Sequence, residues 1–175
     1  MKPLLTLSLL LFLFSCTPEN NNPIQGTMDA YVPVYASAAD VTQISVEAPR
    51  NIAQAGKIYA YGNYVFQNDL NTGIHIIDNT NRTSPQKVSF LKLPLSTEIA
   101  VKSNYLYANN YKDLVVFDIT NPAKPQFVKR VSDVFPLINQ KYPPFLNVYF
   151  ECPDESKGIV VRWELKRINT PKCRR

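Results

Sequence analysis

The feature that most constrains the fold is a stretch that the chain repeats at a fixed spacing. The segment IIDNTNRTSPQKV (residues 76–88) returns as VFDITNPAKPQFV (residues 116–128). With Asp78 placed on Asp118, six positions are identical, occupied by Asp, Thr, Asn, Pro, Gln and Val. Internal periodicity of about 40 residues indicates two copies of one structural unit.

Each copy contains four short runs that are rich in β-branched and aromatic residues and that alternate between apolar and polar positions. These runs lie near residues 57–61, 64–68, 73–78 and 87–93, and again near 98–102, 105–109, 114–119 and 126–131. Four strands per copy predict propeller blades, at about residues 55–94 and 96–136. The predicted fold class is all-β, a partial β-propeller-like array.

The predicted repeat domain covers residues 31–165 and includes more than the two blades. Residues 146–152 and 158–165 read as strands and predict an incomplete third blade. A short helix is predicted to begin near Ser37 and to end before Pro49, where it could cap one edge of the array. Otherwise the open sheet edges favour self-association of the chain.

The repeated Asp-x-Thr-Asn motif predicts a structural turn in each blade. Asp78 and Asp118 end the third strand of their copies, where a carboxylate can accept bonds from backbone N–H groups nearby. Asn81 and Asn121 follow in the same turns. A metal site is the weaker interpretation, because Ile119 replaces the first-copy asparagine and no carboxylate cluster surrounds either motif.

The first 15 residues predict a signal peptide. Lys2 precedes an apolar run from Leu4 to Phe14, which is too short for a membrane span of about 20 residues. The sequence after the run, residues 16–30, starts as a polar stretch without periodicity and reads as a flexible tether. The chain is therefore predicted to be exported.

The end of the leader, Leu13-Phe14-Ser15-Cys16, resembles the bacterial lipobox. The resemblance implies that Cys16 is acylated, that the mature chain starts there, and that the acyl chains attach the protein to a membrane. Thr17 favours the outer membrane by the same resemblance, with the membrane face left open. The alternative is an ordinary signal peptide with Cys16 as a free thiol.

The C-terminal part of the chain contains two further cysteines and a cluster of basic residues. Cys152 and Cys173 either form a disulfide, as an oxidising compartment permits, or remain two thiols. The formal net charge of +5 comes from the C-terminal end, where residues 166–175 read as a solvated basic tail. No basic stripe interleaved with aromatics runs through the body, so no nucleic-acid partner is predicted.

The runs GIHIIDNTNRTSPQKV and DLVVFDITNPAKPQFV resemble LVIVD repeats, and the chain is similar to bacterial LVIVD-repeat lipoproteins. The resemblance implies a propeller-like fold in a membrane-tethered domain outside the cytoplasm, and it implies no catalytic residues. This chain is shorter than family members of that type generally are. Two blades and a partial third cannot close a ring, because propellers typically have at least four blades.

No set of residues in the sequence predicts catalysis, a metal or a cofactor. His75 is the only histidine, and Val116 takes its place in the second copy, which favours packing. Seven tyrosine and phenylalanine residues on the inner strands are interpreted as packing, with a carbohydrate- or peptide-binding surface as the alternative. The predicted function is a non-enzymatic binding or scaffold module of the cell envelope with a protein or glycan partner. The alternatives are an envelope enzyme acting on carbohydrate or peptide, and a truncated, non-functional paralogue.

Overall fold

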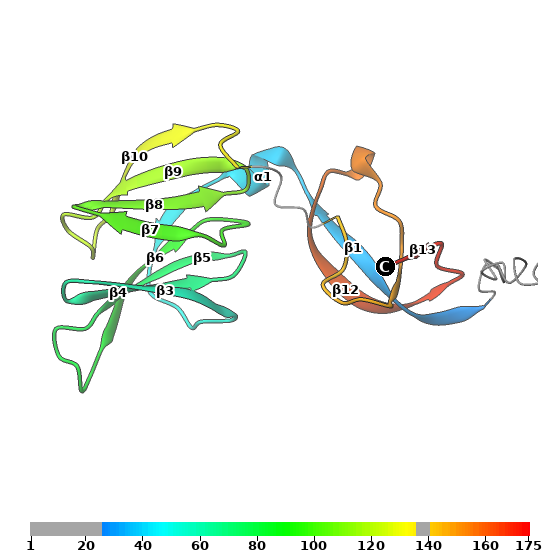
Figure 1. Ribbon diagram of the computed structural model, residues 1–175, viewed down its shortest axis with the longest axis horizontal. Coiled ribbons are helices and arrows are strands. Elements are labelled where there is room, and N and C mark those ends of the chain that lie inside the picture. Colours follow the sequence, from blue (N-terminus) through cyan, green and yellow to red (C-terminus); the bar gives the residue numbers. More distant parts are fainter. Residues whose placement is uncertain (1–25, 136–140) are drawn as a thin grey trace, which may run out of the picture.

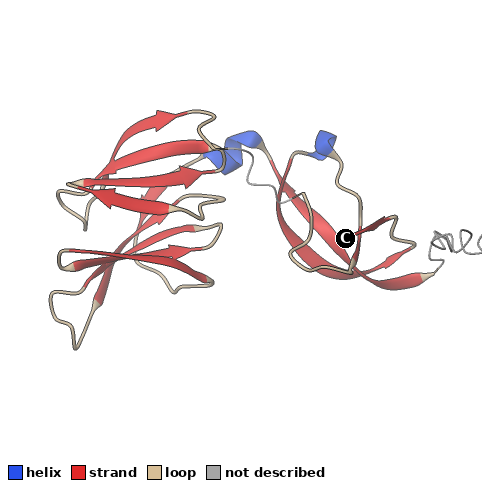
Figure 2. Cartoon of the chain, viewed as in Figure 1, coloured by secondary structure: helices blue, strands red, loops and turns tan. Residues whose placement is uncertain are grey.

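The computed structural model describes residues 26–135 and 141–175. The predicted signal peptide and Cys16 lie outside the described residues. The described chain forms three sheets, two stacked on one another and a third beside them (Figures 1 and 2). No helix within the described ranges is long and apolar enough to cross a membrane.

The first blade contains four consecutive antiparallel strands and one strand from the N-terminal segment. The strands β3 (Ala55–Tyr61), β4 (Tyr64–Asp69), β5 (Gly73–Asp78) and β6 (Gln86–Lys92) follow the predicted runs. The short strand β2 (Ser45–Glu47) pairs with β6, which gives the order β2-β6-β5-β4-β3. The outer edge of this blade is therefore covered by residues that precede it in the chain.

The second blade repeats the same order without an added strand. It consists of β7 (Ile99–Lys102), β8 (Tyr105–Asn110), β9 (Asp113–Asp118) and β10 (Gln126–Val131), arranged β10-β9-β8-β7. Within the described part of the chain, β10 has no strand on its outer side. All eight strands predicted for the two blades are confirmed.

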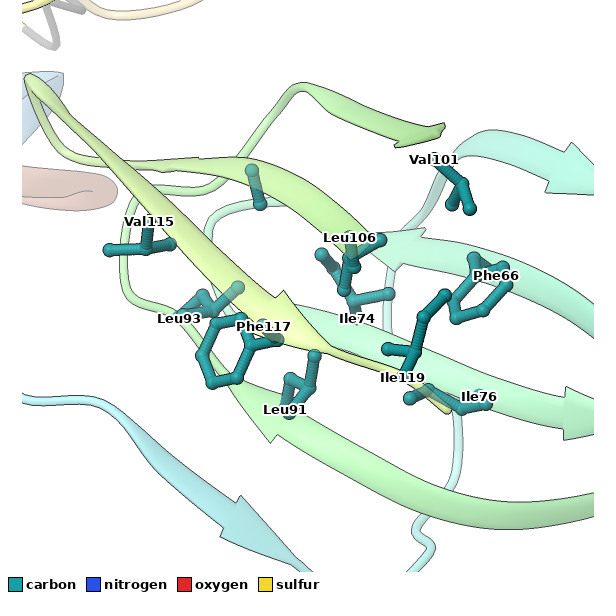
Figure 3. Close-up of a cluster of buried hydrophobic side chains, with 11 residues drawn as sticks. Phe66, Ile74, Ile76, Leu91, Leu93, Val101, Leu106, Val115, Phe117 and Ile119 are labelled. Atoms are coloured by element: carbon teal, nitrogen blue, oxygen red, sulfur yellow. The ribbon is translucent and has the colours of Figure 1, made fainter. Parts of the chain in front are cut away.

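The two blades share one hydrophobic core, which fills the space between their facing sheets (Figure 3). The first blade contributes Phe66, Ile74 and Ile76, all with no exposed surface, and the second contributes Leu106 and Phe117 among others. At about 25 cal/mol per Å² of buried apolar surface, such side chains contribute most of the stability of a two-sheet unit. The blades are therefore stacked as neighbours in a propeller are.

The remaining strands form a third sheet in place of the predicted third blade. The long strands β1 (Thr27–Ala36) and β12 (Ile159–Asn169) pair antiparallel along most of their length. The short strands β11 (Tyr149–Phe150) and β13 (Cys173–Arg174) complete the order β12-β1-β11-β13, with β11 parallel to β1. The two predicted third-blade strands are not neighbours in this sheet, because β1 lies between them, and the interpretation as a blade is wrong.

The same sheet corrects both ends of the predicted domain. Residues 27–30, assigned to the tether, already belong to β1. Residues 166–169 of the predicted basic tail belong to β12, and residues 173–174 form β13. Long basic side chains can occupy a strand while their charged ends stay in water, so the charge pattern did not reveal these strands.

The predicted N-terminal helix exists but is shorter than expected. Helix α1 (Ala38–Thr42) is preceded by the N-cap residue Ser37, whose side chain accepts a bond from the Asp40 N–H while the Asp40 carboxylate accepts one from the Ser37 N–H. This reciprocal pair is a capping box. The helix ends at Thr42 because residues 45–47 extend and pair with β6, so the edge of the first blade is capped by a strand and not by the helix. A second, single-turn helix η1 (Glu155–Lys157) precedes β12.

Candidate binding site

The repeated aspartates form the same turn in both blades. The Oδ1 atom of Asp78 accepts a hydrogen bond from the Thr80 N–H at 2.8 Å, and Oδ1 of Asp118 accepts one from the Thr120 N–H at 2.7 Å. Bonds from Thr80 and Thr120 to the ionised carboxylates hold the pKa values of Asp78 and Asp118 below the usual 3.8. Both aspartates therefore fold the chain at the end of the third strand.

The repeated asparagines complete these turns. Asn81 Oδ1 accepts from the Thr83 N–H at 3.1 Å, and Asn121 Oδ1 accepts from the Ala123 N–H at 3.2 Å. An Asx turn forms when an Asn or Asp side chain accepts a hydrogen bond from the backbone N–H two residues later. Such turns stabilise a sharp change in chain direction. The described ranges hold no group of three or more His, Cys, Asp or Glu residues that could bind a metal ion.

A buried polar cluster lies on the outer face of the first blade. The Asp69 carboxylate accepts hydrogen bonds from the backbone N–H groups of Gln54, at 2.6 Å, and Ala53, at 3.2 Å. Its Oδ2 atom lies 3.3 Å from Nε2 of His75 and 3.8 Å from Nη2 of Arg50. Asp69 thus ties the entry of the blade to its second and third strands.

The environment of this cluster sets the protonation of both groups. Burial disfavours the ionised carboxylate of Asp69, but the backbone N–H donors outweigh it and lower its pKa below 3.8. Burial also disfavours the charged imidazole of His75 and outweighs the neighbouring carboxylate, so the pKa of His75 lies below 6.5. His75 is fully buried and its ring packs on Phe90 at 4.7 Å between centroids. His75 has no surface through which to contact a substrate and serves packing.

The strand register identifies the counterpart of His75 in the second blade. Asn68 pairs with Ile74 in the first blade, and Asn109 pairs with Leu114 in the second, so Ile74 and Leu114 are equivalent. The residue after Leu114 is Val115, and the expected counterpart Val116 is wrong by one position. The one-residue change in repeat spacing, which falls in the turn before the third strand, produced this shift.

A groove with a volume of about 630 Å³ lies between the first blade and the third sheet. One wall is made of two turns that hold each other: the Asn71 N–H donates to Ser96 O at 3.0 Å, and the Leu95 N–H donates to Asn71 O at 2.9 Å. Both Asn71 and Leu95 have left-handed backbone angles, with φ of 63° and 58°. This conformation costs about 1–2 kcal/mol for a non-glycine residue, and the mutual bonds maintain it.

The opposite wall and rim of the groove carry aromatic and basic side chains. Strand β12 supplies Arg162 and the half-buried Trp163, and the C-terminal segments supply Tyr142 and Arg175. The Trp163 ring is fixed edge-on against Phe150 at 5.4 Å. No Asp or Glu is among the residues that line the groove. Its volume falls within the range of about 300–1,000 Å³ that is common for ligand sites.

A disulfide between Cys152 and Cys173 closes the third sheet next to this groove. It joins the segment after β11 to β13, so that Arg175 is held near the groove by a covalent link. A smaller hollow of about 320 Å³ lies beside the disulfide. That hollow is lined mainly by the turn at residues 168–172 and has no aromatic side chain. The larger groove is therefore the better candidate for binding.

The two stacked sheets, each built on four consecutive antiparallel strands with the same turn after the third strand, define tandem propeller-type β-repeats. Comparison with known families identifies the repeat: the LVIVD repeat matches residues 53–90 and 96–133. The chain therefore contains two LVIVD repeats, one in each blade. No curated protein and no solved structure gives a significant match.

The sequence predicts the turns, leaves open whether Cys152 and Cys173 pair, and gives no indication of the groove. The walls come from segments that are far apart in the chain, and the sequence pattern predicts the residues of β12 as part of a blade. The tyrosines that were weighed as a binding surface lie on the blades, whereas the groove uses Tyr142 and Trp163. Trp163 is the only tryptophan of the chain, and this was the one available signal.

Proposed function

We propose that this protein is a lipid-anchored, non-enzymatic binding module of the cell envelope, and that the groove beside Trp163 holds a glycan. The observation that carries the binding part is the groove itself, whose lining includes two aromatic rings, two guanidinium groups and the side-chain amides of Gln54 and Asn71. A flat sugar ring can lie on an aromatic side chain while amide and guanidinium groups bond to its hydroxyls. The acyl groups on Cys16 would hold the module at a membrane.

The disulfide supports export, because such bonds persist in oxidising compartments and are rare in the cytosol. The first described strand starts at Thr27, which leaves a short segment between it and Cys16. Two or more acyl chains bind a membrane firmly, since each buried CH₂ contributes about 0.8 kcal/mol. The outer membrane is proposed on the lipobox resemblance, in which Thr17 follows the cysteine.

The anchor is tested by membrane fractionation of the full chain. Cys16→Ala should move the protein from washed membranes to the soluble fraction. The double variant Cys152→Ala/Cys173→Ala is the matched control, because it removes the other two cysteines and should remain with the membranes. Sedimentation of Cys16→Ala with washed membranes would overturn the proposed anchor.

Glycan binding is tested with polysaccharide purified from the same envelope, in a pull-down with the full chain. Trp163→Ala should reduce retention about tenfold, which corresponds to about 1.4 kcal/mol. Leu165→Ala is the matched control, because Leu165 is on the same strand, 60% exposed, and outside the groove. Equal retention of the two variants, or none by the wild type, would refute the glycan as ligand.

A further inference from the structure

The contact between the two blades uses two different sheet faces. The first blade presents Phe66, Ile74 and Ile76, here called face A, and the second presents Leu106 and Phe117, here called face B. Figure 3 shows the labelled side chains of the two faces gathered between the two sheets. Because the blades are repeats, each one has both faces, and only one face of each takes part in this contact.

Face A of the second blade is an uncovered copy of the face that is buried in the first. Leu114 and Val116 occupy the positions of Ile74 and Ile76 and are partly exposed, whereas the two isoleucines have no exposed surface. Val131 occupies the position of Leu91 in the first blade. Val131 is 38% exposed, whereas Leu91 is fully buried. An apolar sheet face of this kind marks an interaction site.

Face B of the first blade is the matching copy and is uncovered in part, since Gln67 and His75 on the same face are buried. Ile58 is 65% exposed, and Val65 and Ile77 are partly exposed. Their equivalents in the second blade are Ile99, Leu106 and Phe117, all of which pack in the shared core. Part of this face near the polar cluster is covered, where Arg50 lies over the Phe90 ring at 4.0 Å.

The partial cover by Arg50 is not evidence against a neighbouring blade at face B of the first blade. Face B of the second blade is also covered at one corner, and it is packed against a blade. In the second blade the same corner is held by the N-terminal segment, where Arg130 donates to Thr42 O at 2.7 Å and Asn110 donates to Val41 O at 2.8 Å. That corner is covered although face B of the second blade is packed against the first. Cover by Arg50 at the corner is therefore compatible with a neighbouring blade.

We propose that a second copy of this chain packs face B of its first blade on face A of the second blade, and that repetition of this contact closes a ring. The contact inside one chain is the template for the contact between chains. Head-to-tail contacts of this kind generate rings when the rotation closes. Propellers typically have about four to eight blades, so two to four copies would complete one.

Charge supports this pairing of the two free faces. Lys57 forms an exposed ion pair with Glu98, and the two residues are equivalent in the repeat, because each directly precedes an equivalent isoleucine, Ile58 in β3 and Ile99 in β7. In the proposed ring, Glu98 of one copy lies opposite Lys57 of the next, so acidic and basic groups alternate around the inner strands. Such exposed pairs contribute only about 0–1 kcal/mol, but the wrong register would place like charges together.

The third sheet leaves both faces free. The groove that separates it from the first blade is lined by the turns at Asn71–Thr72 and Pro94–Leu95, which lie at strand ends. The third sheet accordingly faces the ends of the strands and not the sheet surfaces. Figure 1 shows it beside the stack, joined through α1.

Crosslinking of the full chain in isolated membranes tests the geometry. Within the chain, the Tyr59 hydroxyl donates to Val101 O at 3.0 Å. Their equivalents are Ala100 and Ala60, two exposed alanines that would face each other between copies. Ala60→Cys/Ala100→Cys with a short bis-maleimide should give a ladder that ends at one closed species of two to four copies. Neither single variant should crosslink above the wild-type background.

The outcomes separate the alternatives. A dimer from Ala100→Cys alone would indicate a two-fold contact of face A with itself and overturn the head-to-tail ring. A ladder without an upper limit would overturn ring closure. A double variant that gives no more crosslinked species than the wild type would overturn self-association through these faces.

A second measurement depends on face A alone. By mass photometry of the detergent-extracted full chain, the wild type should be an oligomer and Leu114→Glu a monomer, with the same circular dichroism spectrum. Leu165→Glu is the matched control, since Leu165 is 60% exposed on the third sheet, and it should remain oligomeric. A monomeric wild type, or an oligomer that persists in Leu114→Glu, would refute the proposal.

Discussion

Ile74 and Leu114 offer a direct test of how much a neighbouring blade contributes to stability. The two residues are equivalent in the repeat, have side chains of equal size, and lose the same three carbons on substitution by alanine. Ile74 is fully buried between the blades, whereas Leu114 is partly exposed. Ile74→Ala should cost about 2.4 kcal/mol in transfer free energy, at about 0.8 kcal/mol per carbon.

A cavity adds to the loss at Ile74. A residual volume of about 50 Å³ would cost a further 1.2 kcal/mol or so, at about 24 cal/mol per Å³. The expected total of about 3.6 kcal/mol lies within the range of about 2–5 kcal/mol for such core substitutions. Leu114→Ala should cost about 1 kcal/mol in the monomer, because its side chain is already partly in water.

Urea unfolding followed by far-UV circular dichroism measures the difference. With a slope of about 2 kcal/mol per M, Ile74→Ala should lower the midpoint by about 1.8 M and Leu114→Ala by about 0.5 M. The proposed ring adds a concentration dependence, because Leu114 becomes buried in the oligomer and its substitution should then cost more. Equal losses at low protein concentration would refute the assignment of the buried and free faces.

Three further predictions concern other parts of the chain. Reduction of the Cys152–Cys173 disulfide should destabilise the third sheet by about 3 kcal/mol, because the bond closes a loop with a sequence separation of 21. The unfolding of the third sheet should change the fluorescence of Trp163 while the blades stay folded. Because burial holds the pKa of His75 below 6.5, the folded state binds fewer protons than the unfolded state below that pH, and stability should fall as the pH decreases. His75→Val should flatten this part of the pH profile of the urea midpoint, and an unchanged profile would contradict the assignment. Asp118→Ala should lower the melting temperature by about 2–4 °C through loss of the turn bond, and an unchanged value would count against the Asx turn.

The blades could be predicted because the sequence patterns that specify them involve residues close together in the chain and occur in both repeats. Alternating residues specify each strand, and the Asp-x-Thr-Asn turn depends on contacts between residues two apart. The second copy removes most of the ambiguity that a single short strand would leave. Only the exact offset was uncertain, which is why the counterpart of His75 was placed one residue too far.

The third sheet could not be predicted because its pairings join the two ends of the chain. Thr27 pairs with Asn169, and no local pattern indicates such a partner. The segment after α1 was expected to remain helical, but the free edge of β6 selected the extended conformation at Ser45–Glu47. The groove depends on the long-range pairing of the third sheet, so no local sequence motif predicts it.

The two ends of the array are not equally protected. In repeat proteins, stability is approximately the sum of each repeat and its contacts with neighbours, so a terminal repeat needs a cap. The first blade gains β2 at its edge and the Arg50 segment over part of its free face. Among the described residues, β10 gains no further strand, and the apolar side chains of face A on the second blade stay partly exposed. The second blade is therefore the end of the array with the stronger physical reason to take a partner.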